Sequence, residues 1–426
     1  MDNIKDRKEE RRNLVVAYFA WGWAALFFFY QYILRVAPGV MIHEIRHDFK
    51  INADQFATLG SFYLYAYALL QIPMGIIVDR IGVRRTIFGS IVLCLAGSLL
   101  LSYSQNFLTA QLSRIMVGAG SASAFMCALK IVSDRLPTGR RGLLMGATLT
   151  LGTFGALLAG KPLVYFLDDF GWRTIMIYIT FLGIILLFFS LIFIPKHSKQ
   201  SSPFAKKELT DLGQNIVSII KNNRIMLYAL LSVGLYTPLS TLGDLWGTAF
   251  LMQKFSLPHA EAAQTTMMMF IGLAAGSLIM PMICEKHNFL DRAIQLCGLG
   301  IILLFCFLLY GPIINNILLT LLLICLGFFC AAEMMCFTGA LLFSNPNNSG
   351  LTVGIINTFM LGGALLQQFI GYSLDFYWNG RLDEQGIRIY ESHHFVISFS
   401  ALTVIVILCF FASLKLIKKK TAKDYI

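Results

Sequence analysis

The sequence predicts an all-α membrane protein that crosses the bilayer about twelve times. Hydrophobic residues make up 57% of the 426 residues and charged residues only 13%, whereas a soluble domain carries about 25% charged residues. The apolar residues are also gathered into long runs, and a helical span needs roughly 20 of them in succession. Composition and grouping therefore place most of the chain in lipid.

The predicted spans follow one another with short polar connections. They are the apolar runs 14–40, 55–78, 86–104, 107–133, 142–167, 173–195, 225–252, 260–284, 292–311, 313–342, 350–375 and 394–417. The first run follows a polar start and contains no small-residue cleavage site, so we interpret it as a retained span and not as a secretory signal. An even number of spans predicts that both termini lie on one side.

The distribution of basic residues predicts which side that is. With the N-terminus inside, 24 of the 34 Lys and Arg residues lie in inner segments, 6 in outer segments and 4 within spans. Basic residues close to span ends tend to remain in the cytoplasm. We therefore expect both termini to be cytoplasmic, and we expect a multi-pass protein of a bacterial inner (plasma) membrane.

The longest inner segment, 196–224, divides the chain into two domains. It is polar and basic, and it separates six spans in residues 1–195 from six spans in residues 225–426. Within this cytoplasmic linker, residues 207–220 are either a short amphipathic helix on the membrane surface or part of a flexible connection. The sequence leaves both alternatives open.

Composition and motifs argue against several other classes of protein. The net charge of +11 is carried by short basic runs between spans and not by one basic face, which argues against nucleic-acid binding. The nine cysteines are scattered without a metal-binding spacing, and the motifs HExxH, GxSxG and the P-loop are missing. We therefore expect no enzyme activity, no metal and no other cofactor.

The connection between the second and third spans carries a motif. Residues 75–85 read GIIVDRIGVRR. A glycine within a span permits close helix contact, and a glycine after its end allows a tight turn. The basic residues hold the loop at the cytoplasmic face. The residues to which we assign conformational gating are Gly75, Asp79, Arg80, Gly82, Arg84 and Arg85.

This connection resembles the G-x-x-x-D-R-x-G-R-R signature of the major facilitator superfamily. Residues 114–120, RIMVGAG, are similar to the superfamily's R-x-x-x-G-x-G, and the resemblance covers the whole chain. It implies two six-helix bundles around a central cavity that opens alternately to either side. We expect a monomer whose partners are the lipid bilayer and a small-molecule substrate.

A narrower resemblance lies at the end of the first span. Residues 30–41, YQYILRVAPGVM, are similar to the start of bacterial phagosomal nutrient transporters, which import amino acids or nucleosides. The position of Arg35 also resembles that of the substrate-binding arginine of organophosphate antiporters and organic-anion symporters. The first likeness makes amino acids our first substrate hypothesis, and the second leaves an organic-anion or organophosphate exchanger as an alternative.

Ionisable residues within spans are costly in lipid and therefore mark the predicted solute path. The N-terminal half places Arg35, Arg114 and Lys161 at similar depths, and the C-terminal half supplies Asp244 and Glu333. Because spans 1 and 7 are equivalent in the two halves, we expect Arg35 and Asp244 to face each other. Arg35 would bind a carboxylate through its planar fork, and Asp244 or Glu333 would take an ammonium group or a coupling proton.

Aromatic and amide residues complete the predicted substrate-binding set. They are Tyr63, Tyr67, Tyr236 and Gln367. The first two lie one helical turn apart on one face. Structural alternatives stay open for two of the cations: Arg114 would bridge helices, and Lys161 would pair with Asp168 or Asp169.

Together these residues predict a proton-coupled symporter or a facilitative importer of small carboxylate-bearing nutrients. A transporter-like membrane receptor is the alternative from another class. Such a receptor is expected to carry a signalling domain inside the cell, yet the longest inner segment has fewer than thirty residues. A transporter is therefore the favoured function.

The asymmetry of basic residues predicts the outcome of reporter fusions. A green fluorescent reporter fused after Ile426 should fluoresce, because it folds in the cytoplasm, where positive-inside counting places the C-terminus. Alkaline phosphatase fused after Asn106, in a predicted outer connection, should be active, because that enzyme folds only outside the cytoplasm. The opposite pattern of activities would contradict the predicted orientation.

Overall fold

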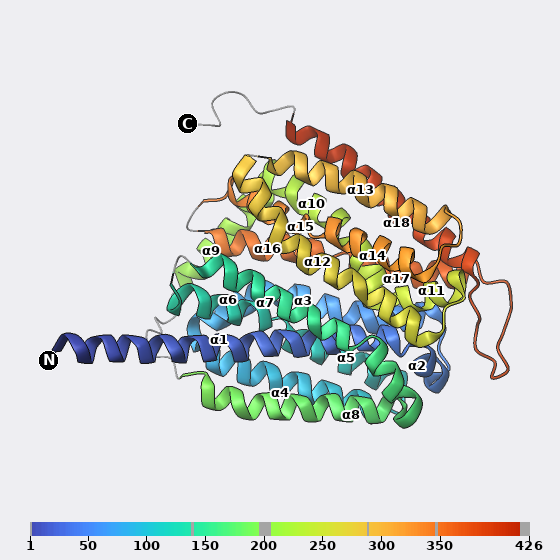
Figure 1. Cartoon of the computed structure of the whole chain (residues 1–426), viewed down its shortest axis with the longest axis horizontal. Coiled ribbons are helices and arrows are strands. Elements are labelled where there is room, and N and C mark those ends of the chain that lie inside the picture. The colour runs from blue at the N-terminus through green and yellow to red at the C-terminus, as the bar shows by residue number, and fades with distance from the viewer. Residues whose placement is uncertain (1, 138–139, 196–205, 288, 346–347, 418–426) are drawn as a thin grey trace.

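The computed structural model shows a protein made almost entirely of helices (Figure 1). It describes residues 2–137, 140–195, 206–287, 289–345 and 348–417. In this described part, β pairing is limited to one antiparallel bridge between Leu382 and Arg388. The predicted all-α fold class is confirmed.

The helices of the N-terminal half run from blue to green in Figure 1 and lie together on one side of the molecule. They are α1 (Asp2–Val40), α2 (Ile42–Phe49), α3 (Ala53–Ile81), α4 (Val83–Ser102), α5 (Phe107–Ser121), α6 (Ala124–Arg135), α7 (Arg141–Leu158) and α8 (Lys161–Phe193). Their neighbours in space are mostly one another, as expected for one bundle of a two-bundle fold.

The helices of the C-terminal half run from light green to red and lie on the other side. They are α9 (Lys206–Ile220), α10 (Asn223–Pro238), η2 (Leu239–Trp246), α11 (Gly247–Phe255), α12 (His259–His287), α13 (Leu290–Tyr310), α14 (Asn316–Cys330), α15 (Glu333–Leu341), α16 (Ser349–Leu361), α17 (Ala364–Phe376) and α18 (Ser392–Ile417). η2 is a π-helix, and with α10 and α11 it forms one continuous crossing.

Eleven helical stretches of the described residues are long and apolar enough to cross a membrane. The remaining predicted span, 142–167, is divided between α7 and the first turns of α8. Gly171 then adopts a φ of 73° inside α8, a conformation that glycine tolerates, and the chain turns there into the predicted span 173–195. This division accounts for the twelfth crossing.

Several crossings are interrupted near their middle by two small residues. The breaks are Ala122-Ser123 between α5 and α6, Ala159-Gly160 between α7 and α8, Ala331-Ala332 between α14 and α15, and Gly362-Gly363 between α16 and α17. They occur in equivalent crossings of the two halves. Discontinuous helices in corresponding positions are typical of transporter folds and point to a central binding site.

The two ends of the helix array differ. α1 begins and α18 ends at the same end, where α9 also lies, and we call this end the terminal face (Figure 1). The opposite end, with α2 and the segment 377–391, is the α2 face. The helix at Lys206–Ile220 favours the amphipathic helix over the flexible connection that the sequence left open for residues 207–220.

The predicted gating loop lies where α3 ends and α4 begins. Gly82 has a φ of 81°, in agreement with a tight turn, and Arg84 donates a hydrogen bond of 2.6 Å to the carbonyl of Leu191. The expected close helix contact at Gly75 is wrong for this conformation, because no described atom of another helix lies within 4 Å of the position its Cβ would take. The side chain of Asp79 lies outside the described part.

Candidate functional site

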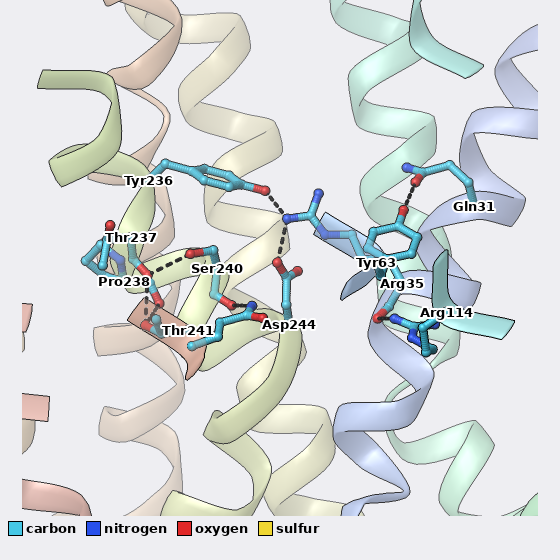
Figure 2. A network of polar contacts seen from close by, with 11 residues as sticks. Gln31, Arg35, Tyr63, Arg114, Tyr236, Thr237, Pro238, Ser240, Thr241 and Asp244 are labelled. Carbon is cyan, nitrogen blue, oxygen red and sulfur yellow. Dashed lines mark hydrogen bonds and ion pairs between the residues drawn. The ribbon is translucent and has the colours of Figure 1, made fainter. Parts of the chain in front are cut away.

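Arg35 lies at the centre of a polar network that joins the two halves of the protein (Figure 2). Its guanidinium donates hydrogen bonds to the Asp244 carboxylate, at 2.5 Å, and to the Tyr236 hydroxyl. Arg35 belongs to α1, whereas Tyr236 and Asp244 belong to α10 and η2. Both charged side chains are buried, with exposed fractions of 7% and 4%. The predicted facing of Arg35 and Asp244 is confirmed.

Pro38 explains how α1 is held next to this network. A proline has no N–H, so the carbonyl of Leu34, four residues earlier, lacks its helical partner. Arg114 of α5 donates to that carbonyl at 2.8 Å, and to the carbonyls of Leu59 at 3.0 Å and Arg35 at 3.4 Å. All three guanidinium nitrogens of Arg114 are thus occupied, which favours its helix-bridging alternative over substrate binding.

Asp244 is carried by the π-helix η2, which directly follows Pro238. π-helical turns are wider than α-helical turns and occur frequently at functional sites. η2 packs closely against α1, since a Cβ added to Gly39 would lie 2.5 Å from the carbonyl oxygen of Asp244. Glycine permits this approach, and it lies one helical turn after Arg35. The close packing keeps the two charged side chains within reach of each other.

Gln367 of α17 contacts the η2 backbone within the C-terminal half. Its amide nitrogen donates to the carbonyl of Ser240 at 2.5 Å, and the Trp246 indole donates to the main-chain carbonyl of Gln367 at 3.3 Å. The side-chain oxygen of Gln367 is buried and has no hydrogen-bond partner among the described residues. The structure therefore brings Gln367 to the cluster with one acceptor atom unused.

Aromatic rings surround the guanidinium of Arg35. Its central carbon lies 5.6 Å from the ring centroids of both Tyr32 and Tyr236, a distance at which cation–π attraction operates. Tyr32 also packs edge-on against Phe270 of α12, with ring centroids 5.9 Å apart. The two halves thus supply both the charged and the aromatic parts of the cluster.

Tyr63 and Tyr67 lie next to each other on the neighbouring part of α3, with their rings tilted by 35°. Their ring centroids are 6.1 Å apart, and both side chains are buried. Tyr63 donates a hydrogen bond of 2.6 Å to the side-chain oxygen of Gln31, and its ring lies 4.8 Å from the guanidinium of Arg114. The predicted i, i+4 pair on one helix face is confirmed.

Glu333 lies at the start of α15, immediately after the break in the tenth crossing. Its side chain is 2% exposed and lies within electrostatic reach of Arg35 and Asp244. Four buried atoms of this cluster lack a hydrogen-bond partner among the described residues: Arg35 Nε, Asp244 Oδ1, Glu333 Oε2 and Gln367 Oε1. Unpartnered buried polar atoms are costly, so the cluster offers one donor and three acceptors to a bound solute.

Lys161 is not brought into this cluster. It begins α8, and its ammonium lies 5.6 Å from the ring centroid of Tyr165 in the same helix. Its backbone N–H donates to the side chain of Gln264 in α12 at 3.3 Å. Lys161 therefore connects the two halves through its main chain in this conformation, and not through its charge.

Sequence reasoning missed three members of the network: Gln31, Tyr32 and Ser240. Signals for them were present. Gln31 and Tyr32 lie about one helical turn from Arg35, and Pro238 interrupts the seventh span just before Ser240. A proline inside a span leaves a carbonyl without its helical partner and marks irregular backbone, which in a membrane occurs where protein or water surrounds it.

The α2 face is closed by contacts between the two halves. Asp375, at the end of α17, accepts a hydrogen bond of 2.8 Å from the backbone N–H of Asp54 and forms an ion pair of 2.9 Å with Arg388. Asp54 lies in the first turn of α3, where the helix dipole favours a nearby carboxylate. Gln368 donates to the Asp54 carboxylate at 2.6 Å.

α2 and the start of α12 add to this closure. Arg46 donates a hydrogen bond of 2.9 Å to the carbonyl of Arg388, and a ring nitrogen of His259 lies 2.8 Å from the carbonyl oxygen of Val40. Each contact joins the N-terminal half to the C-terminal half. Access to Arg35 from the α2 face therefore requires these contacts to separate.

Comparisons with known proteins agree with this architecture. The sequence model of the Major Facilitator Superfamily matches residues 15–367. A hexuronate transporter of Bacillus subtilis (strain 168) is 22% identical over 264 residues, which are 60% of this chain and 62% of that protein. A riboflavin transporter of Clostridioides difficile (strain 630) is 30% identical over 155 residues, which are 36% of this chain and 33% of that protein. The matches span less than two thirds of these relatives.

One solved structure is similar over nearly the whole chain. It is a bacterial homolog of the human lysosomal transporter Spinster, in an inward-facing and unoccupied conformation, with a TM-score of 0.74. The match covers 96% of this chain and 99% of that chain at 18% sequence identity. At this identity the likeness shows the fold alone, and it agrees with the fold implied by the motif at residues 75–85.

The bracing of Leu34 by Arg114 predicts a specific double-mutant result. Arg114→Gln should lower the stability of the purified protein, because a buried carbonyl left unsatisfied costs about 1–3 kcal/mol. Pro38→Ala restores the N–H that Leu34 lacks, so Arg114→Gln should cost less in the Pro38→Ala background than in the native chain. Thermal unfolding in detergent measures both costs, and equal costs in the two backgrounds would contradict the bracing of Leu34 by Arg114.

Proposed function

This chain belongs to the Major Facilitator Superfamily, and from that premise we propose that it carries a small carboxylate-bearing solute across the membrane by alternating access. The family consists of transporters of small solutes and not of enzymes. The observation that carries the proposal is the buried Arg35–Asp244 pair, shared between the two halves. A solute that takes the place of Asp244 on Arg35 would break a contact between the halves and so favour their separation.

The guanidinium of Arg35 supports a carboxylate as the recognised group. Its planar fork presents donors that match the two oxygens of a carboxylate, and its Nε has no described partner. Tyr32 and Tyr236 enclose the charge with aromatic rings, so the site is shielded from water. A solute anion would meet both the charge and an unused donor in a low-dielectric environment, where such hydrogen bonds are strong.

Charge balance supports a proton as the coupling ion. When Arg35 binds a solute carboxylate, an ionised Asp244 is left as a buried charge without its partner, which costs about 3–5 kcal/mol. Protonation of Asp244 removes that charge. Glu333, close by and also buried, offers a second proton acceptor. Solute and proton would therefore enter the site together, as in a symporter.

The acceptor atoms around Arg35 determine which chemical groups the rest of the solute should carry. Asp244, Glu333 and Gln367 each hold an oxygen without a described partner, so the solute should carry donors such as an ammonium group or hydroxyl groups. Amino acids satisfy this requirement and are our first hypothesis. Sugar acids satisfy it too, and the likeness to a hexuronate transporter supports the organic-anion alternative.

Alternating access would use both ends of the helix array. We propose that the terminal face is cytoplasmic and that the α2 face opens outward when the contacts around Asp375 separate. At the terminal face, the segment from Asp79 to Arg85 would limit how far α3 and α4 move. Arg80 lies in the last turn of α3 and Arg85 in the first turn of α4, and the basic side chains of such a loop resist entry into lipid. We further propose that the protein acts as a monomer.

A screen of solutes tests the substrate class first. Purified protein should be stabilised against heat by its solute, because a ligand of the folded state raises stability by mass action. The panel should contain amino acids, hexuronates, nucleosides, sugar phosphates and neutral sugars. Stabilisation by carboxylates supports the proposal, and stabilisation by neutral sugars alone would contradict it.

Arg35→Gln should reduce uptake of the stabilising solute into proteoliposomes at least about a hundredfold, because loss of a buried charged hydrogen bond costs several kcal/mol and each 1.4 kcal/mol is a factor of ten. The matched control is Lys161→Gln, which removes another cation of the same half outside the network and should retain most uptake. Loss of uptake in the control with retention in Arg35→Gln would contradict the assignment.

Asp244→Asn should abolish accumulation driven by a pH gradient while exchange of labelled for unlabelled solute continues. The physical reason is that asparagine cannot exchange a proton, yet it keeps an oxygen in the same place. Uptake with and without an imposed gradient, compared with counterflow in the same proteoliposomes, gives the measurement. Glu333→Gln is the parallel variant, and full gradient dependence in both variants would indicate that neither carboxylate carries the coupling proton.

A further inference from the structure

A cavity of about 240 Å³ lies at the α2 face, apart from the Arg35 network. It is lined by α2 from the N-terminal half, and by α11, the start of α12, the segment 383–390 and Phe395 of α18 from the C-terminal half. Its titratable lining residues are His43, Arg46, His259, Asp383, Arg388 and Tyr390. Because both halves supply its walls, the cavity exists only while they meet at this face.

Arg46 is the buried cation of this cavity. Its side chain is only 7% exposed. One terminal nitrogen donates to the carbonyl of Arg388 at 2.9 Å, and the guanidinium lies 4.8 Å from the ring centroid of Tyr390. Its Nε is buried without a hydrogen-bond partner among the described residues. Burial lowers the pKa of Arg46, and the nearby acidic groups, Asp375 and Asp383 among them, oppose this effect only in part.

The other charges of the cavity are already engaged. Arg388 forms its ion pair with Asp375 at 2.9 Å. The carboxylate of Asp383 accepts backbone hydrogen bonds from Gln385 at 2.9 Å and Ile387 at 2.8 Å within its own loop. None of the ion pairs found among the described residues involves Arg46. The cavity thus combines a buried cation, an unused donor and an excess of basic side chains.

The volume limits what can enter. About 240 Å³ corresponds to about eight water molecules at roughly 30 Å³ each. This is enough for a three- to six-carbon acid and too little for a peptide or a nucleotide. A small anion that bonds to Arg46 would remove the cost of its unpaired buried donor.

We propose that this cavity is a second binding site for a small carboxylate-bearing solute, with Arg46 as the ligand of the carboxylate. The choice of a carboxylate solute rests on the proposed function, whereas the site itself is separate from Arg35. Because both halves line the cavity, an occupant binds only the conformation that is closed at the α2 face. Occupancy therefore shifts the protein toward that conformation and slows transport at high solute concentration.

The test follows labelling of a cysteine placed in the cavity wall. Met252 lines the cavity and is partly exposed, so Met252→Cys should react with the thiol reagent MTSES. Glucuronate should slow that reaction, about tenfold at ten times its Kd, since only the unoccupied fraction reacts. Glucose, which has an alcohol where glucuronate has its carboxylate, should not slow it. Mass spectrometry assigns the label to position 252.

Matched variants show whether the protection arises from binding in the cavity. Arg46→Gln should abolish the protection, whereas Arg173→Gln, which removes an arginine of the same face outside the cavity, should retain it. Tyr103→Cys, a 71% exposed position beside Ser102, which Arg173 contacts, should be labelled equally with and without glucuronate. Arg35→Gln removes a contact between the halves, so glucuronate should still protect this variant, but at a higher concentration, even though uptake is lost. The two proposals therefore fail separately.

A variant that binds glucuronate more tightly is a useful addition, because misfolding cannot produce an increase in affinity. Asp383→Asn removes the acidic charge from the wall and keeps the oxygen that accepts from Gln385 and Ile387. Glucuronate should then protect at lower concentration. The proposal is overturned if neither glucuronate nor lactate protects at about 50 mM, fifty times a millimolar Kd. It is also overturned if glucose protects equally, if protection survives Arg46→Gln, or if Arg35→Gln shows no protection at any glucuronate concentration up to about 50 mM.

Discussion

The contact between the two halves at the centre of this structure depends on the ion pair between Arg35 and Asp244. Each half of the protein contributes one charge, and both are buried. Moving a charge out of water costs several kcal/mol, and removal of one partner leaves that cost unopposed. The pair therefore holds the halves in contact at the centre. In the function proposed above, a solute anion that takes the place of Asp244, or a proton that neutralises it, would release this contact and so couple solute recognition to the movement of the halves.

Irregular helices make this arrangement possible, and the cost of irregularity in a membrane decides which side chains surround it. A broken backbone hydrogen bond must find another partner where no water is present. Pro38 leaves the carbonyl of Leu34 unpaired, and Arg114 satisfies it. The π-helix η2 has its Ser240 carbonyl satisfied by Gln367. Residues that look like solute ligands in a sequence can thus serve the backbone instead, as Arg114 does here.

The α2 face shows the same dependence on two halves in contact. Its closure depends on Asp375, which accepts a hydrogen bond from the N-terminus of α3 and forms an ion pair with Arg388. The cavity beside Arg46 is formed by the same closed arrangement. The central network and this cavity are therefore both properties of one relative position of the halves. Any ligand that distinguishes between positions of the halves will act on both places, because a shift in one equilibrium changes every site that depends on it.

The sequence by itself determined the spans, the family and the facing of Arg35 and Asp244, because hydropathy is local and the spacing of charges along a helix sets their depth. Only the tertiary structure decided which way each side chain points around its helix and what it meets there. In the structure, Lys161 lies outside the network, and Arg114 donates to backbone carbonyls. No other helix lies close to Gly75, and Arg46 lines a cavity. The depth of a residue in the membrane follows from its position along a span. The direction of its side chain and the residues that it contacts depend on how helices from distant parts of the sequence pack together.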